Sequence, residues 1–233
     1  MDLRSPARAS AFLLATLAVL WLLGWGLGAI VHGLATGQTF VVDRPVLRFL
    51  VDHRSGLLTT AIRALTFMGG FPVLLPVVAV AGVTWWLARQ TLRPLLLLAI
   101  GYGGSASLTD GIKAIVDRPR PPVADAIGHY SGASFPSGHA LDAMVVYGSL
   151  ALLVARASRR TPVRTAAWSS ALVLVGAIAF TRLYLGAHWL TDVLAGILLG
   201  ALWIAALAAA LPRRAAGRLA ASPVDRSGPD QPP

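Results

Sequence analysis

Three short clusters of polar residues carry side chains whose types and spacing suit phosphoryl transfer. They read Lys-x6-Arg-Pro from 113 to 121, Pro-Ser-Gly-His from 136 to 139, and Arg-x5-His-x3-Asp from 182 to 192. Lys113 is the only lysine in a chain with twenty basic residues. Cations, histidines and a carboxylate in this combination can bind an anion, transfer a proton and attack phosphorus.

The first and third clusters supply cations for a phosphate. A phosphoryl group in transfer spreads charge over its equatorial oxygens, so its catalysis depends on positioning and electrostatic stabilisation. We expect Lys113, Arg120 and Arg182 to form this clamp, since each arginine offers two parallel donors. Two Arg-Pro pairs, beginning at Arg118 and Arg120, fit the motif. The alternative for all these cations is a side chain that reaches from a helix to the membrane interface.

The second cluster has the composition of a helix start. Proline is favoured in a first turn, Ser137 can cap the helix, and Gly138 lets the backbone approach a ligand closely. The free N–H groups at such an end form an anion site. The alternative is an ordinary helix cap followed by an interfacial histidine, His139.

The third cluster contains a histidine and an aspartate four residues apart. On a helix this spacing places His188 and Asp192 on one face, one turn apart. Asp192 can then accept the proton-bearing nitrogen of His188 and fix its tautomer, which leaves the other nitrogen free to attack phosphorus. The alternative, a solvated helix cap, is disfavoured because an aspartate inside a membrane helix is costly without a partner.

The composition indicates that an integral membrane domain positions these clusters. Hydrophobic residues make up 56% of the 233 residues and charged residues only 13%, about half the fraction usual in soluble domains. The net charge of +10 fits basic residues that flank membrane helices better than a nucleic-acid surface, because no basic patch has interleaved aromatic residues. The absence of cysteine excludes disulfides and thiolate metal sites. We expect no metal and no cofactor.

Apolar periodicity predicts an all-α bundle of six transmembrane helices. The spans are expected at about 10–35, 71–88, 94–116, 137–156, 165–184 and 188–211. Between the first two spans, residues 37–70 are too polar to cross and predict short amphipathic helices at the outer interface. Such helices would form a lid on the helix ends or guide a lipid substrate.

The predicted membrane domain covers residues 10–211 and lies between two cytoplasmic ends. Residues 1–9 form the N-terminus, and residues 212–233 predict a disordered tail because they are rich in proline, serine and arginine. With six spans, twelve of the twenty basic residues fall on the side of the termini, so the positive-inside rule places both termini in the cytoplasm of a multi-pass cell-membrane protein.

The same topology brings the three clusters to one face. Lys113 and Arg182 end the third and fifth spans, whereas Ser137 and His188 begin the fourth and sixth. Odd-numbered spans end on the outer side and even-numbered spans begin there. We therefore expect a single site on the periplasmic or extracellular face. Polar groups at membrane depth are costly and are usually functional.

With these motifs the chain resembles the type 2 phosphatidic acid phosphatase (PAP2) superfamily in its six-helix membrane form. The resemblance extends from the first span to about residue 211, and its specific motifs lie between 113 and 192. The family spacing selects Arg120 for the first motif, which leaves Arg118 as a loop cation or a neighbour behind the site. Thr181 stands where the family usually has serine, and residues 189–191 lack a frequent proline.

The resemblance also implies roles for the motif residues. Ser137 and Gly138 would contact the phosphate, and His139 would be the general acid that protonates the leaving oxygen. His188 would carry a phosphohistidine intermediate that water hydrolyses, with Asp192 as its carboxylate partner.

Two further aspartates lie one turn deeper in the membrane. Asp110 precedes Lys113 by three residues, and Asp142 follows His139 by three. They would either hold these side chains in place or mark water access at the helix ends.

Together these features predict a metal-independent lipid phosphatase embedded in the bilayer. Candidate substrates are undecaprenyl diphosphate, phosphatidic acid and phosphatidylglycerol phosphate. One alternative is a phosphotransferase on the same scaffold; another is a non-catalytic lipid-binding or flipping protein. The clusters indicate neither the lipid tail nor the oligomeric state.

Overall fold

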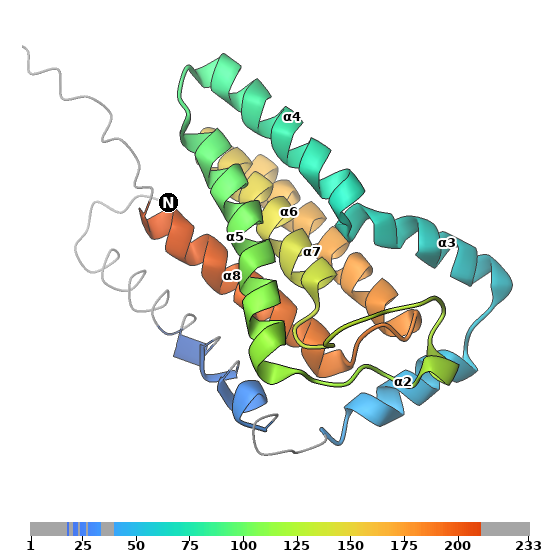
Figure 1. The fold of residues 1–233 in the computed structure, drawn as a ribbon. Helices are drawn as coiled ribbons and strands as arrows, with labels where there is room; N and C mark the ends of the chain where they lie inside the picture. The colour runs from blue at the N-terminus through green and yellow to red at the C-terminus, as the bar shows by residue number, and fades with distance from the viewer. Residues whose placement is uncertain (1–17, 19–20, 23, 27, 34–39, 211–233) are drawn as a thin grey trace, which may run out of the picture.

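A computed structural model describes residues 18, 21–22, 24–26, 28–33 and 40–210, and every regular element in them is helical (Figure 1). The elements after the first helix are α2 (Asp43–Asp52), α3 (Gly56–Thr66), the 3-10 helix η1 (Phe67–Gly69), α4 (Phe71–Arg89), α5 (Arg93–Val116), the 3-10 helix η2 (Val123–Asp125), α6 (Gly138–Ala157), α7 (Thr161–Tyr184) and α8 (Leu190–Ala210). The all-α prediction is confirmed for the described residues.

Five helices, α4 to α8, are long and apolar enough to cross a membrane. They agree with the second to sixth predicted spans to within four residues. The largest difference is the start of α7 at Thr161 rather than 165, where Pro162 occupies the first turn and its fixed φ favours helix initiation. In the first predicted span, residues 18, 21–22, 24–26 and 28–33 are helical. The rest of that span and the predicted segments 1–9 and 212–233 lie outside the described residues.

The central helix of the bundle is α6. Within its apolar 18-residue stretch, 67% of the residues are buried, whereas the corresponding share in α4 is 17%. Helix α6 packs against α5, α7 and α8. Leu141, Val145 and Val146 of α6 join Leu98 of α5 and Ile178 of α7 in the hydrophobic core. Because α6 is enclosed by its neighbours, the residues at its start have fixed surroundings.

A glycine brings the starts of α6 and α8 together. A Cβ atom on Gly196 would lie 2.6 Å from the carbonyl oxygen of Ser137, so only glycine permits this crossing. The backbone N–H of Ser137 donates to the carbonyl of Asp192 over 3.0 Å. The second and third clusters are thus joined through their backbones.

The two short helices α2 and α3 occupy the segment in which short helices were predicted. They pack against α7, and α2 also contacts α8. Arg54, between them, donates to the carbonyl of Tyr184 at 2.6 Å and to that of Asp125 at 2.8 Å. These contacts tie the segment to the bundle, while its position at a membrane interface stays a prediction.

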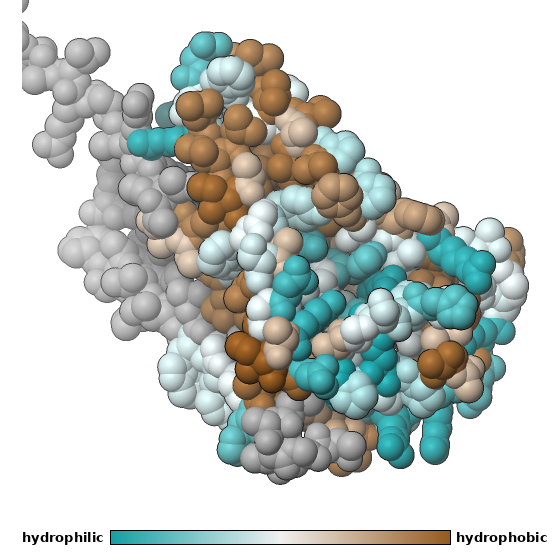
Figure 2. Space-filling model, viewed as in Figure 1, coloured by the Kyte–Doolittle hydropathy of each residue, from teal (hydrophilic) through white to brown (hydrophobic). Residues whose placement is uncertain are grey.

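Surface hydropathy separates the two ends of the molecule. Figure 2 shows apolar side chains along the upper helices below a small hydrophilic tip, and a larger hydrophilic region at the end where α2, α3 and the loop after α5 lie. Exposed apolar residues on α4 include Leu75, Val80 and Val83. This apolar surface is of the kind that faces lipid in membrane proteins.

Candidate active site

The three predicted clusters meet at the hydrophilic end of the bundle. Lys113 lies in the last turn of α5 and Arg182 in that of α7, whereas Ser137 immediately precedes α6. His188 lies just before α8, with its Nε2 3.4 Å from Nη1 of Arg120. The helix ends thus gather in the way that the alternating span directions predict.

His188 is buried and its hydrogen bonds assign its tautomer. Its Nδ1 lies 2.7 Å from the carbonyl oxygen of Ser134, which can only accept, so Nδ1 carries the proton. Nε2 faces Arg120, which can only donate, and therefore presents its lone pair. Burial lowers the pKa of His188 to about 4, although Asp192 acts to raise it. The ring is neutral at pH 7, as a nucleophile requires.

Asp192 is fully buried and is held by several donors. Its carboxylate accepts hydrogen bonds from the side chains of Arg118 and Ser134 and from the backbone N–H of Trp189. Its Oδ2 lies 3.6 Å from Nδ1 of His188, which is an electrostatic contact rather than a hydrogen bond. The carbonyl of Ser134, not Asp192 as the spacing suggested, therefore accepts the His188 proton.

Arg118 is shared between two carboxylates. It pairs with Asp192 through Nη1 and with Asp43 through Nη2, the latter over 2.6 Å. Its side chain is only 11% exposed, so it is the neighbour behind the site rather than a loop cation. Asp43, at the start of α2, also accepts from the backbone N–H and the hydroxyl of Thr191. The sequence offers no signal for this long-range contact of Asp43.

The predicted phosphate clamp lies on the other side of His188. Arg120 donates to the carbonyl of Ala187 over 2.7 Å, and Arg182 donates to the hydroxyl of Thr66 over 2.8 Å. Both guanidinium groups lie over the ring of Tyr130, 5.9 and 5.2 Å from its centroid. Burial lowers the pKa of Arg120, while the charge of Asp192 opposes that shift. Tyr130 was not predicted, since a lone aromatic in a loop has no distinguishing pattern.

Four buried side-chain atoms have no hydrogen-bond partner within the described residues, and two of these belong to predicted phosphate-binding residues. They are Oγ of Ser137 and Nε of Arg182. Ser137 occupies the N-cap position of α6, yet its hydroxyl makes no capping bond, so the simple helix-cap alternative does not account for it. A buried polar group without a partner costs about 1–3 kcal/mol. Arg182 lies close enough to Lys113 and Arg120 for their charges to interact, and such a cluster is suited to a bound oxyanion.

The other histidine of the three clusters, His139, lies in the first turn of α6 and is half-buried. Its ring lies within range of electrostatic interaction with three cations, Arg182, Lys113 and Arg120. A Cβ atom on Gly70 would lie 3.6 Å from its Nε2, at ordinary van der Waals distance, so the backbone that precedes α4 passes close to the ring.

The two predicted supporting aspartates have different surroundings. Asp142 accepts a 2.6 Å hydrogen bond from Ser105 of α5, and Asp110 is exposed on α5. A hydrogen bond to Lys113 or His139 forms for neither of them in the described part of the chain. Their role in holding those side chains stays a prediction.

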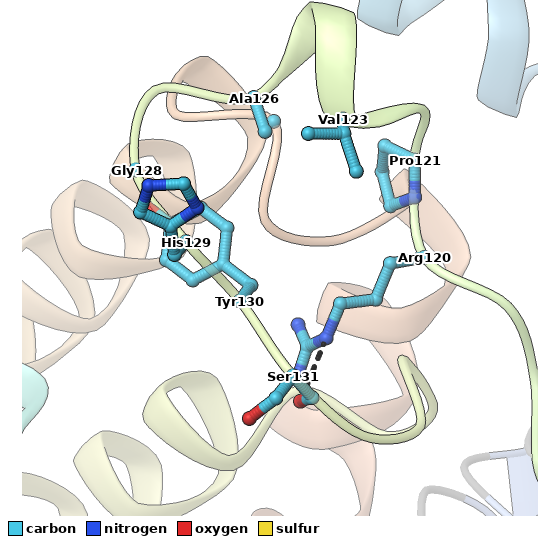
Figure 3. A pocket seen from close by; sticks show the side chains of 9 residues that line it. Arg120, Pro121, Val123, Ala126, Gly128, His129, Tyr130 and Ser131 are labelled. Carbon is cyan, nitrogen blue, oxygen red and sulfur yellow. Dashed lines mark hydrogen bonds between the residues drawn. The ribbon is translucent and has the colours of Figure 1, made fainter.

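A hollow of about 220 Å³ lies in the loop between α5 and α6. Figure 3 shows Arg120 beside Ser131, with Tyr130 and His129 further along the loop. Arg120 is the one clamp residue that lines this hollow, and neither His139 nor His188 does. Over the residues that the structure describes, no three His, Cys, Asp or Glu side chains group as metal ligands.

The fold and site define an all-helical membrane protein with a histidine and clustered cations at one end of its bundle. The chain belongs to the PAP2 superfamily, whose family profile matches residues 94–216. This membership and the phosphatase relatives described next support a membrane lipid phosphatase, an enzyme of the phosphoric monoester hydrolase class.

Individual relatives agree with this assignment. The chain is 31% identical over 180 residues to phosphatidylglycerophosphatase B of Bacillus subtilis (strain 168), which covers 76% of this chain and 85% of the relative. The crystal structure of a transmembrane PAP2-type phosphatidylglycerolphosphate phosphatase from Bacillus subtilis matches with a TM-score of 0.70 at 29% identity, over 82% of this chain and 92% of that one. Aquifex aeolicus LpxE shares the fold, with a TM-score of 0.58 at 20% identity over 72% and 95% of the two chains.

Proposed function

We propose that this protein hydrolyses a lipid phosphate monoester or diphosphate on the outer face of the cell membrane, through a phosphohistidine at His188 and without a metal. The observation that carries the proposal is the pair of buried, unpartnered atoms, Ser137 Oγ and Arg182 Nε, in the site where His188 presents a lone pair. A phosphate would supply the acceptors that these donors lack.

In the first step Nε2 of His188 attacks phosphorus. The bond from phosphorus to the leaving oxygen breaks, and His139 donates a proton to that oxygen. Lys113, Arg120 and Arg182 stabilise the charge on the equatorial oxygens. The ring of His188 keeps its Nδ1 proton on the carbonyl of Ser134 and becomes an N-phosphorylated imidazolium, which the Asp192 carboxylate stabilises.

In the second step water attacks the phosphohistidine. His139, now neutral, accepts a proton from that water, and the bond between phosphorus and Nε2 breaks. Inorganic phosphate leaves the clamp. The cycle returns His188 to its neutral form and His139 to its protonated form.

The proposed topology has six spans in a domain over 10–211, with both termini cytoplasmic and the tail 212–233 disordered. The excess of basic residues on the side of the termini supports this orientation. The helices α2 and α3 would then lie at the outer interface. Their contacts with α7 and α8 favour a lid on the helix ends.

The substrate candidates remain those that the site chemistry allows: undecaprenyl diphosphate, phosphatidic acid and phosphatidylglycerol phosphate. The relative at 31% identity is named for phosphatidylglycerophosphate, which supports phosphatidylglycerol phosphate as the first candidate to test. All three present a terminal phosphate to the clamp while the tail stays in the bilayer.

Phosphate release from these three lipids in detergent tests the proposal. The His188→Ala variant should lose on the order of 10⁵-fold or more in kcat, because removal of a nucleophile leaves only binding and electrostatic catalysis. His53→Ala, at an exposed position at the end of α2, is the matched control and should keep full activity. Activity retained in His188→Ala would contradict the phosphohistidine route, and label recovered on a second lipid would indicate a transferase.

A further inference from the structure

A buried aspartate of the short helix α2 is connected to the catalytic carboxylate. Asp43 is 3% exposed and begins α2. It accepts hydrogen bonds from the backbone N–H of Thr191 at 3.0 Å, from the Thr191 hydroxyl at 2.8 Å and from Arg118 at 2.6 Å. Thr191 directly precedes Asp192. A segment far from the motifs in sequence therefore reaches the residue beside the catalytic carboxylate.

The three charged groups form a row. Arg118 lies between Asp43 and Asp192 and pairs with both. Two carboxylates and one guanidinium give the row a net charge of −1. With Arg118 and Asp192 alone, the net charge would be zero, and the cation would cancel most of the field of Asp192 at His188.

We propose that Asp43 is a positioning residue for catalysis: it neutralises Arg118, so that the charge of Asp192 remains available to His188. This inference rests on the proposed phosphohistidine route. It gives α2 a role in the chemical step in addition to covering the helix ends.

The surroundings of His188 make that charge necessary. The groups that face the ring from the neighbouring elements are cations and a histidine: Arg120 from the loop after α5, Arg182 from α7, and His139 from α6. Asp192, from α8, is the carboxylate that faces it in the described part of the chain. Attack at Nε2 adds a positive charge to the ring among these cations. The row of Asp43, Arg118 and Asp192, with its net charge of −1, stabilises the positive charge on the His188 ring. A neutral pair of Arg118 and Asp192 would stabilise it much less.

A purely structural role for Asp43 predicts different behaviour. If Asp43 served only to fasten α2 to α8, its loss would lower stability and activity without changing the proton affinity of His188. The acid limb of kcat/KM against pH reports that proton affinity in the free enzyme. Burial lowers the pKa of His188 to about 4, so the neutral ring persists above that pH, and we expect the acid limb of the wild-type enzyme near pH 4.

The test measures kcat/KM against pH for Asp43→Asn, Arg118→Gln and the double variant, with phosphatidylglycerol phosphate in detergent. Asp43→Asn removes a negative charge and should move the acid limb to lower pH, with a fall in kcat of roughly ten- to hundredfold. Arg118→Gln leaves two carboxylates and should move the limb to higher pH. The double variant restores a net charge of −1, so its limb should return toward that of the wild type.

Asp52→Asn is the matched control, because it removes the same charge from an exposed position at the other end of α2. It should change neither the limb nor kcat. A reduced kcat for Asp43→Asn with an unmoved limb would overturn the inference in favour of a structural role. If Asp43→Asn does not fold, as judged by size exclusion and thermal unfolding, the double variant must still show a lower limb than Arg118→Gln.

The proposed function can fail separately from the inference. No phosphate release by the wild type, or full activity in His188→Ala, would reject the phosphohistidine route itself. A wild type that is active and loses activity in His188→Ala, together with an Asp43→Asn variant that behaves like the wild type, would reject the role of Asp43 alone.

Discussion

The two halves of the active site differ in where their polar groups find partners. In the nucleophile half, His188 and Asp192 bond to protein groups: Ser134, Arg118 and the backbone of Trp189. In the anion half, Oγ of Ser137 and Nε of Arg182 are buried without partners among the described residues. The protein fixes the nucleophile by itself, whereas the clamp is suited to being completed by substrate.

This difference concerns how binding energy is used. Donors fixed in place before the substrate arrives need no reorganisation as charge develops in the transition state. Each unpaired buried donor costs stability in the free protein, and a bound phosphate offsets that cost. Substitutions in the two halves should therefore be distinguishable by whether they affect the folded protein or the bound phosphate.

After the loss expected for His188→Ala, the largest effect should come from the acid on the substrate side, His139. His139→Ala should lower kcat on the order of a hundred- to ten-thousand-fold for a lipid phosphate, because the alkoxide then leaves without a proton. With nitrophenyl phosphate, whose leaving group is stable as an anion, the loss should be much smaller. Initial rates of the wild type and of His139→Ala on the two substrates give the loss of activity for each. Equal losses on both would show that His139 does not act on the leaving oxygen.

A pair of serines gives a direct comparison of the halves. Ser134 and Ser137 are both fully buried, but only the hydroxyl of Ser134 has a partner, the carboxylate of Asp192. Ser134→Ala should lower the free energy of unfolding by about 1.5–3 kcal/mol, since a hydrogen bond to a charged group is lost. Ser137→Ala should leave thermal stability equal or slightly higher and should weaken inhibition by inorganic phosphate.

Thermal unfolding in detergent and inhibition constants for inorganic phosphate, measured on both variants, test this contrast between Ser134 and Ser137. If Ser137→Ala destabilised the free protein as much as Ser134→Ala does, the hydroxyl of Ser137 would have a structural partner, and the contrast between the halves would be lost.

The smallest expected effect is that of a chelator. Lys113, Arg120 and Arg182 supply the positive charge that a metal ion would otherwise provide to a transferring phosphoryl group. Phosphate release should therefore be unchanged in EDTA. Activity that disappears in EDTA and returns with Mg²⁺ would show that the clamp is incomplete without a metal.

The sequence predicted the features that depend on local pattern. Apolar runs located the second to sixth spans, and alternating span directions predicted that Lys113, Ser137, Arg182 and His188 lie at one end of the bundle. The start of α7 was missed by four residues because its first turn is polar and contains a proline. Local pattern therefore predicts which helix ends meet.

The contacts that complete the site depend on tertiary packing and could not be predicted in this way. The acceptor for His188 is a backbone carbonyl, that of Ser134, which has no residue signature. Asp43 reaches Thr191 across 148 positions of sequence, and Tyr130 meets both clamp arginines from a loop. Motif spacing places a residue on an element, but it does not identify which distant backbone or side chain lies against it.

The close approach at Gly196 also limits how this bundle can diverge. A methyl group there would lie 2.6 Å from the carbonyl oxygen of Ser137 and 3.2 Å from the backbone nitrogen of Leu141. Both obstacles are main-chain atoms, which no change of neighbouring side chain can remove. At an exposed apolar position on α4, such as Val80, another aliphatic side chain would extend outward from the bundle. Position 196 cannot accept any side chain while the starts of α6 and α8 stay in contact.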